Sequence, residues 1–150
     1  MTIKEKLSIE LKEAMRNKDP IKRTVIRTLM SAIKNAEIDS QSELNDDGII
    51  LVFSKQAQQR KDSIEAYEKA DRQDLVQNEK AELDFISQFL PEQMSEHEIE
   101  KLIEKVINEV NATNPSDMGK VMGKLMPQVK GKADGKLVNS IVTSKLQGIT

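Results

Sequence analysis

Lysines and glycines gather toward the carboxyl end of this 150-residue chain, and they are its best candidates for chemistry. Between residues 115 and 150 there are six lysines, whereas Asp117 and Asp134 are the only acidic residues. Clustered lysines attract polyanions, and each phosphate that a lysine neutralises releases counterions. The segment therefore predicts an RNA-binding surface, although lysines at such spacing more often form a solvated helix face.

Two glycines lie four residues apart in the same segment. Gly119 and Gly123 fall on a predicted helix in which Lys120 and Lys124 share one face. Each glycine costs a helix about 1 kcal/mol relative to alanine, so the pair indicates that something approaches this backbone closely. A neighbouring helix and a sugar-phosphate backbone are both consistent with it. The apolar face opposite is made of Met118, Val121, Met122 and Leu125.

No group of residues predicts catalysis, and we expect no metal and no cofactor. The absence of cysteine excludes a thiolate nucleophile and Cys-ligated zinc. The run from Gly131 to Lys136 lacks the glycine spacing, the Ser or Thr after lysine and the preceding strand of a phosphate loop. His97 lies in a predicted helix cap, which makes it a surface residue. Glu79 and Glu82 receive no catalytic role, because 25 acidic residues produce such pairs by chance.

Apolar residues recur at helical spacing along most of the chain, which predicts an all-α protein. We expect an N-terminal helical hairpin domain of about four helices over residues 1–90 and a C-terminal three-helix bundle over residues 92–150. The boundary is drawn at Pro91, which breaks the pattern, and five of the six glycines follow it.

Local capping signals predict where several helices begin. Asp19 and Pro20 form an N-cap followed by proline at the first helical position. Ser95 and Glu98 form a capping box, and Asp134 is expected to cap the last helix. The polar run from residue 39 to residue 48 is predicted to be a loop.

Composition favours a folded cytoplasmic protein. The formal net charge is −2, and 37% of the residues are hydrophobic. No stretch approaches the ~20 apolar residues that span a bilayer, and the first residues lack the apolar core of a signal peptide. We therefore expect no membrane partner, and the lack of cysteine fits a reducing compartment.

The first 90 residues offer fewer candidate contacts for a polyanion. Arg60 falls on an apolar stripe, where it either snorkels to solvent or, as we favour, pairs with Glu79 or Glu82. The few aromatic residues fall on core positions, so any RNA recognition is expected to read backbone and shape. We expect no basic stripe here, because acidic residues are interspersed along the chain with Lys22, Arg23, Arg27 and Lys34.

The lysine-glycine segment resembles the tail domain of the GatB subunit of glutamine-dependent aminoacyl-tRNA amidotransferases, a domain that binds the tRNA body. The residues that carry this resemblance are Gly123-Lys-Leu-Met126, Lys130-Gly131-Lys132-Ala133 and Leu137-Val138-Asn139. Over nearly all its residues the chain resembles the stand-alone YqeY family, which joins such a tail to a helical N-terminal domain. Matching features outside the tail are Gln56 to Arg60, Ser63, Arg72-Gln-Asp-Leu75, Glu79, Glu82 and Phe89-Leu-Pro-Glu-Gln-Met-Ser95.

The resemblance implies a tRNA-binding accessory protein related to these amidotransferases, which are carbon-nitrogen ligases with glutamine as amido donor. The chain holds no amidase or carboxylate-activating segment, so it is expected to have no active site of its own. tRNA is the expected partner, and a subunit of a tRNA amidotransferase or synthetase is a further candidate. Two alternatives stay open: an adaptor whose glycine and lysine face binds a partner helix, and a ligase component that supplies tRNA binding to a separate catalytic subunit. The candidate nucleic-acid contacts are Lys120, Lys124, Lys130, Lys132, Lys136, Gly119, Gly123, Gly131 and Asn139.

Overall fold

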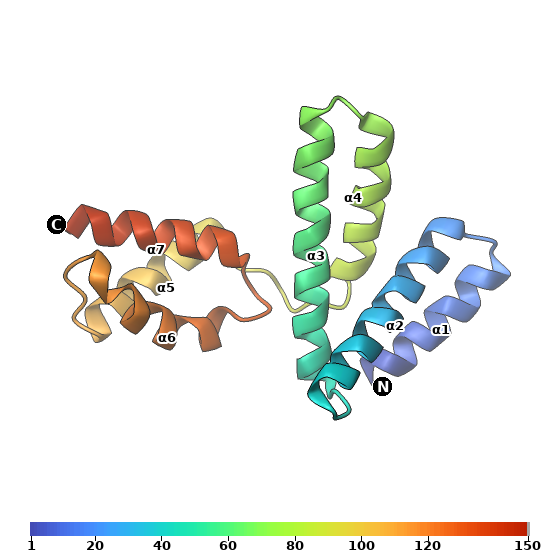
Figure 1. The fold of residues 1–150 in the computed structure, drawn as a ribbon, viewed down its shortest axis with the longest axis horizontal. Coiled ribbons are helices and arrows are strands. Elements are labelled where there is room, and N and C mark those ends of the chain that lie inside the picture. The colour runs from blue at the N-terminus through green and yellow to red at the C-terminus, as the bar shows by residue number, and fades with distance from the viewer. Residues whose placement is uncertain (150) are drawn as a thin grey trace. The chain divides into compact units, whose positions relative to one another are not determined.

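The computed structural model describes residues 1–149, and the prediction of an all-α protein is confirmed. These residues form seven α-helices and one short 3-10 helix, with no strand among them (Figure 1). The chain divides into two compact units, unit 1 from Met1 to Leu90 and unit 2 from Pro91 onward. None of the described helices has the length and apolar character needed to cross a bilayer.

Unit 1 consists of two helical hairpins. Its helices are α1 (Ile3–Arg16), α2 (Pro20–Ser40), α3 (Asp46–Lys69) and α4 (Gln73–Ser87). The second helix packs against the other three, and the turn between α3 and α4 lies at the end of that hairpin away from α1 and α2 (Figure 1). As predicted, Asp19 caps α2 by accepting a hydrogen bond from the Lys22 N–H, with Pro20 at the first helical position.

The predicted loop from residue 39 to residue 48 is wrong in its extent. Helix α2 continues to Ser40, and Gln41 ends it with a left-handed φ of 55°. Asn45 then caps α3 by accepting a hydrogen bond from the Gly48 N–H at 2.9 Å. The connection is therefore shorter than predicted, and the partly buried Glu37 carboxylate ties it to α1 by accepting hydrogen bonds from the Leu44 N–H and the Lys4 ammonium, both at 2.8 Å.

The core of unit 1 lies where the two hairpins meet. Ile26, Leu29, Phe53 and Ile86 are fully buried there, and they come from α2, α3 and α4. The Phe53 ring meets the Phe89 ring edge to face, with centroids 5.7 Å apart. Burying side chains of this size contributes about 1.5–3 kcal/mol each, which is what holds the two hairpins together.

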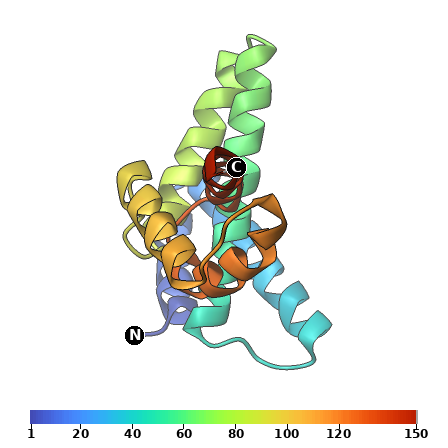
Figure 2. The ribbon, with the colours of Figure 1, turned by 90° about the vertical axis from the view of Figure 1, so that its left-hand side faces the viewer.

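Unit 2 packs three helices around a core of its own. It holds α5 (Glu96–Glu109), the 3-10 helix η1 (Pro115–Asp117), α6 (Met118–Val129) and α7 (Gly135–Ile149). In Figure 2 α7 is seen end on, with α5 and α6 on either side of it. The predicted Ser95–Glu98 capping box is confirmed at the start of α5, and Asp134 accepts a hydrogen bond from the Lys136 N–H at the start of α7. The fully buried side chains are Ile103, Val106, Val121, Leu125, Val138, Val142 and Leu146.

Candidate nucleic-acid interface

Helix α6 presents its glycines and lysines on the face opposite its core residues. Val121, Leu125 and Val129 are buried at the three- and four-residue spacing of a helix that packs on one side. Gly119, Lys120, Gly123 and Lys124 lie on the other side of the helix and are exposed, whereas Met122 and Met126 are partly buried. We call this surface the α6 face, and it consists of Gly119, Lys120, Gly123 and Lys124.

The two glycines of the α6 face are not explained by packing among the residues that the structure describes. A methyl group placed on Gly119 or Gly123 would meet no other part of the described chain within 4 Å. No neighbouring helix of the described residues therefore requires a glycine at either position. Each glycine nevertheless costs the helix about 1 kcal/mol, and the bare backbone beside the lysines is open to a ligand.

Both lysines of the α6 face have carboxylate partners. The Lys124 ammonium lies 2.7 Å from Glu109 Oε2 at the end of α5, and the Lys120 ammonium lies 3.7 Å from Asp117 Oδ1. The hydrogen bond from Lys124 lowers the pKa of Glu109 below its ordinary value, and hydrogen bonds from the backbone of Thr113 and Asn114 lower the pKa of Asp117. Because the two lysine side chains are 47% and 68% exposed, these pairs are weak and a phosphate can replace the carboxylate.

The turn after α6 adds two lysines without such partners. Lys130 and Lys132 are exposed, and no carboxylate of residues 1–149 lies within 4.0 Å of either ammonium. Gly131 between them is buried and has a φ of 79°, and its carbonyl accepts a hydrogen bond from the Gln93 side chain at 3.0 Å. The left-handed turn thus accounts for this glycine without a ligand. The Lys132 carbonyl is also held, by the Met94 N–H at 2.8 Å.

Helix α7 continues this surface with one lysine and with uncharged polar side chains. Lys136 and Asn139 of α7 are exposed, Thr143 follows one turn after Asn139 and is also exposed, and Val138 and Val142 are buried. The Thr143 hydroxyl donates to the Asn139 carbonyl at 2.8 Å and also lies 3.8 Å from the sulfur of Met118, the first residue of α6. The exposed polar side of α7 therefore lies beside the start of α6.

Acidic side chains of unit 2 are concentrated on α5. From Met118 onward Asp134 is the only acidic residue in the sequence, whereas α5 carries Glu96, Glu98, Glu100, Glu104 and Glu109. Glu104 holds the Lys145 ammonium at 2.8 Å, and this lysine is not one of the candidate contacts. Helices α6 and α7 thus carry little negative charge of their own, and the carboxylates that compete with a phosphate for Lys124 and Lys120 come from Glu109 of α5 and Asp117 of η1.

The remaining sequence candidates have structural roles. His97 is exposed in the first turn of α5. The predicted pairing of Arg60 is confirmed, because its Nε lies 3.4 Å from Glu82 Oε2, and its Nη1 donates to the Gln56 side chain at 2.7 Å. Burial raises the pKa of Glu79, with the Glu82 charge adding to the rise and Arg60 opposing it.

The expectation that unit 1 has no basic stripe is wrong. Arg23, Arg27 and Lys34 all lie on the exposed side of α2, whose residues 20–36 contain no acidic residue. Along the chain these basic residues are flanked by the carboxylates of α1 and of the end of α2, but on the helix surface they stand apart from them. The four-residue spacing of Arg23 and Arg27 was the signal, because it places both on one helix face.

Comparisons with known proteins identify relatives of the chain. The family model described as "Yqey-like protein" matches residues 4–146. "Altered inheritance of mitochondria protein 41, mitochondrial" from Lachancea thermotolerans is 45% identical over 85 residues, which are 56% of this chain and 46% of that protein. The proteins of the same name from Candida glabrata and Saccharomyces cerevisiae are 39% identical over 88 residues and 42% identical over 82 residues. The match to the Candida protein covers 57% of this chain and 48% of that protein. The match to the Saccharomyces protein covers 54% of this chain and 44% of that protein. The matches thus span about half the length of these relatives.

Proposed function

This chain belongs to the YqeY family, and on that premise we propose that it is a tRNA-binding accessory protein of glutamine-dependent aminoacyl-tRNA amidotransfer. It holds the tRNA on unit 2 and brings no active site of its own to the reaction. The observation that carries the proposal is the open backbone at Gly119 and Gly123, which lies beside exposed lysines and serves no packing within the described chain.

Phosphate contacts explain the composition of this surface. Lys120 and Lys124 lie on the helix, and Lys130 and Lys132 lie on the turn that follows it. An ammonium group neutralises a phosphate without reading the base, so these lysines position the RNA and give affinity that falls with salt. The glycines allow the RNA backbone to approach α6 more closely than any side chain would permit.

An adaptor that binds a partner helix is the second candidate. Exposed glycines four residues apart also admit the close approach of another helix, and the partly buried Met118, Met122 and Met126 lie beside them. The lysines of the turn distinguish the two candidates, because a helix packed on Gly119 and Gly123 has no need of Lys130 and Lys132.

We propose the cytoplasm as the compartment of this chain. The relatives from Lachancea, Candida and Saccharomyces are named as mitochondrial proteins, so a mitochondrial location is the alternative that imaging of a tagged full-length chain would reveal.

The proposal is tested by fluorescence anisotropy with labelled tRNA. Replacing Lys124, Lys130 and Lys132 with Glu should weaken binding for all tRNA sequences, and the slope of log affinity against log salt should lose roughly 0.7–0.9 per contact removed. The matched control makes the same charge change at Lys61, Lys69 and Lys80, which are exposed on α3 and α4. Equal affinities and slopes for the two variants would overturn the proposal, and loss of a partner protein with unchanged tRNA affinity would favour the adaptor.

A further inference from the structure

Unit 1 carries a row of basic side chains along one exposed side of α2. Arg23, Arg27 and Lys34 lie four and seven residues apart, and each is exposed. At ~1.5 Å rise per residue the row extends over about 16 Å, the axial length of four or five phosphates of one strand in a duplex. No carboxylate of residues 1–149 lies within 4.0 Å of any of the three charged groups. We call this row the α2 stripe.

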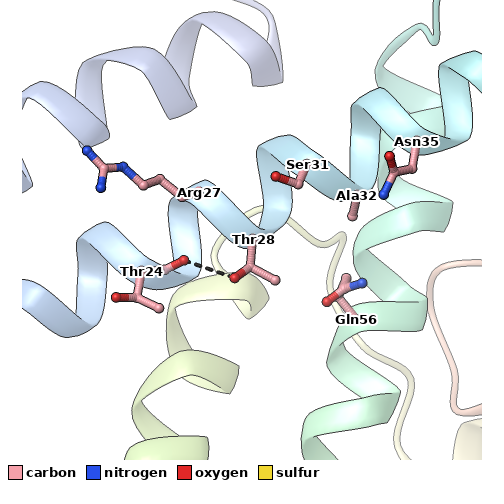
Figure 3. A pocket seen from close by; sticks show the side chains of 7 residues that line it. All are labelled: Thr24, Arg27, Thr28, Ser31, Ala32, Asn35 and Gln56. Carbon is pink, nitrogen blue, oxygen red and sulfur yellow. Dashed lines mark hydrogen bonds between the residues drawn. The ribbon is translucent and has the colours of Figure 1, made fainter.

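A polar groove of about 460 Å³ runs beside the α2 stripe (Figure 3). Arg27 belongs to both the stripe and the groove, and Gln56 of α3 lies across from Ala32 of α2. Apart from Arg27 and Ala32 the lining side chains carry neutral hydroxyl or amide groups, and they are Thr24, Thr28, Ser31, Asn35 and Gln56.

Most of these polar groups are free to bind a ligand. The side chains of Thr24, Ser31 and Asn35 make no hydrogen bond with any residue that the structure describes. The Thr28 hydroxyl donates to the Thr24 carbonyl at 3.0 Å and so keeps its oxygen as an acceptor (Figure 3). The Gln56 carbonyl oxygen accepts from Arg60, which leaves its NH2 group as a donor.

Carboxylates are absent from both helices along the groove. Residues 20–36 of α2 and residues 48–61 of α3 contain no Asp or Glu. The next carboxylate along α2, that of Glu37, is held by Lys4 at 2.8 Å, and Glu10 of α1 is held by Lys22 at 2.6 Å. The groove therefore combines unneutralised positive charge with neutral hydrogen-bonding groups.

We propose that the α2 stripe and its groove form a second RNA-binding surface, which takes a phosphodiester strand across Arg23, Arg27 and Lys34. The basic side chains contact phosphates, and the hydroxyl and amide groups contact phosphate oxygens and the 2′-hydroxyls that distinguish RNA. An acidic protein fits less well, because Ala32 is the only apolar side chain that lines the groove and protein interfaces depend on buried apolar anchors. The choice of RNA as ligand rests on the proposed function of unit 2.

The test uses the full-length chain and anisotropy with labelled tRNA. Replacing Arg23, Arg27 and Lys34 with Gln should weaken binding roughly five- to eightfold per lost contact at ~0.1 M salt, and should reduce the salt slope by roughly 0.7–0.9 per contact. The matched control replaces Lys61, Lys69 and Lys80 with Gln and should bind within about twofold of the wild type. An α2 stripe variant that equals this control overturns the inference.

The two proposals fail separately. If the α2 stripe variant binds normally while charge reversal at Lys124, Lys130 and Lys132 weakens binding, unit 2 alone holds the RNA and this inference is wrong. If only the α2 stripe variant is weakened, the inference stands and the proposed site in unit 2 is wrong. Polyglutamate is added as a competitor at the same concentration of charge as unlabelled tRNA. If it displaces the labelled tRNA as effectively as unlabelled tRNA does, the surface binds an acidic protein and the choice of RNA is wrong.

Chemical modification of the wild-type protein tests the proposal without any variant. Phenylglyoxal modifies exposed guanidinium groups, and peptide mass spectrometry reports the rate at each arginine. Bound tRNA should slow the modification of Arg23 and Arg27 severalfold and leave that of Arg72, an exposed residue paired with Asp74, unchanged. Equal rates at Arg23 and Arg27 with and without tRNA would overturn the proposal.

Discussion

Replacing Glu109 with Gln should strengthen tRNA binding by unit 2. In the free protein the Glu109 carboxylate holds the Lys124 ammonium at 2.7 Å. A phosphate that binds at Lys124 must displace this carboxylate, and it is then repelled by the negative charge of Glu109 nearby. The Lys124 hydrogen bond lowers the pKa of Glu109 from its ordinary value, which favours the charged form that competes with the phosphate.

The size of the effect follows from the exposure of the pair. The Lys124 side chain is 47% exposed and that of Glu109 is 34% exposed, and ion pairs of this kind contribute about 0.2–1 kcal/mol. Since ~1.4 kcal/mol corresponds to a tenfold change in affinity, Glu109→Gln should raise tRNA affinity by up to about fivefold. The gain should shrink as salt increases, because salt screens exposed charges.

A matched control is available on the same helix. Glu104 of α5 holds the Lys145 ammonium at 2.8 Å, and the pKa of Glu104 is likewise lowered by this hydrogen bond. Glu104→Gln makes the same charge change, but it frees a lysine that is not a candidate contact. Anisotropy titrations should therefore rank the affinities as Glu109→Gln first, Glu104→Gln second and wild type third. Equal affinities for the two variants, or weaker binding by Glu109→Gln, would refute the assignment of Lys124 as a phosphate contact.

Three further predictions concern the stability of the protein and the independent folding of unit 2. Gly123→Leu should raise the free energy of unfolding in urea by roughly 0.5–1 kcal/mol, because leucine favours a helix and the position is open. The same substitution should weaken tRNA binding. Loss of helicity or unchanged tRNA binding would contradict this. The pKa of Glu79 is raised in the folded protein, so ionisation of this carboxyl opposes folding. Relative to the wild type, Glu79→Gln should therefore become more stable as the pH rises from about 4 to 7, by less than about 1 kcal/mol. A stability difference that does not change with pH would refute this reasoning. A fragment of residues 92–150 should keep a helical circular dichroism spectrum, because every side chain of the second core comes from unit 2; a random-coil spectrum would mean that unit 2 needs unit 1 to fold.

Helix beginnings could be predicted from the sequence where the capping chemistry is local. Asp19 with Pro20 and Ser95 with Glu98 satisfy free backbone N–H groups within one turn, so their effect does not depend on the rest of the fold. Asn45 is a cap of the same kind, but the polar run around it concealed the start of α3. The end of α2 could not be predicted, because Gln41, and not a glycine, takes the left-handed conformation that ends the helix.

The candidate site was predictable to the extent that one helix defines it. The spacing of Gly119, Lys120, Gly123 and Lys124 was enough to place them on one side of α6, and the structure leaves that side exposed. The pairing of Lys124 with Glu109 depends on how α5 packs against α6, which no local pattern reports. The α2 stripe also lay within reach of the sequence, since the charges of residues 20–36 needed only to be plotted by helix face.

The most direct test of the central claim is an NMR titration of the 15N-labelled chain with tRNA, in which glycine amides act as reporters. Gly119 and Gly123 are open positions on the α6 face, whereas Gly48 lies in the first turn of α3 against Leu44. If unit 2 binds tRNA through the α6 face, substoichiometric tRNA should shift or broaden the Gly119 and Gly123 signals first and leave Gly48 nearly unchanged. Unperturbed Gly119 and Gly123 signals at saturating tRNA would contradict this claim.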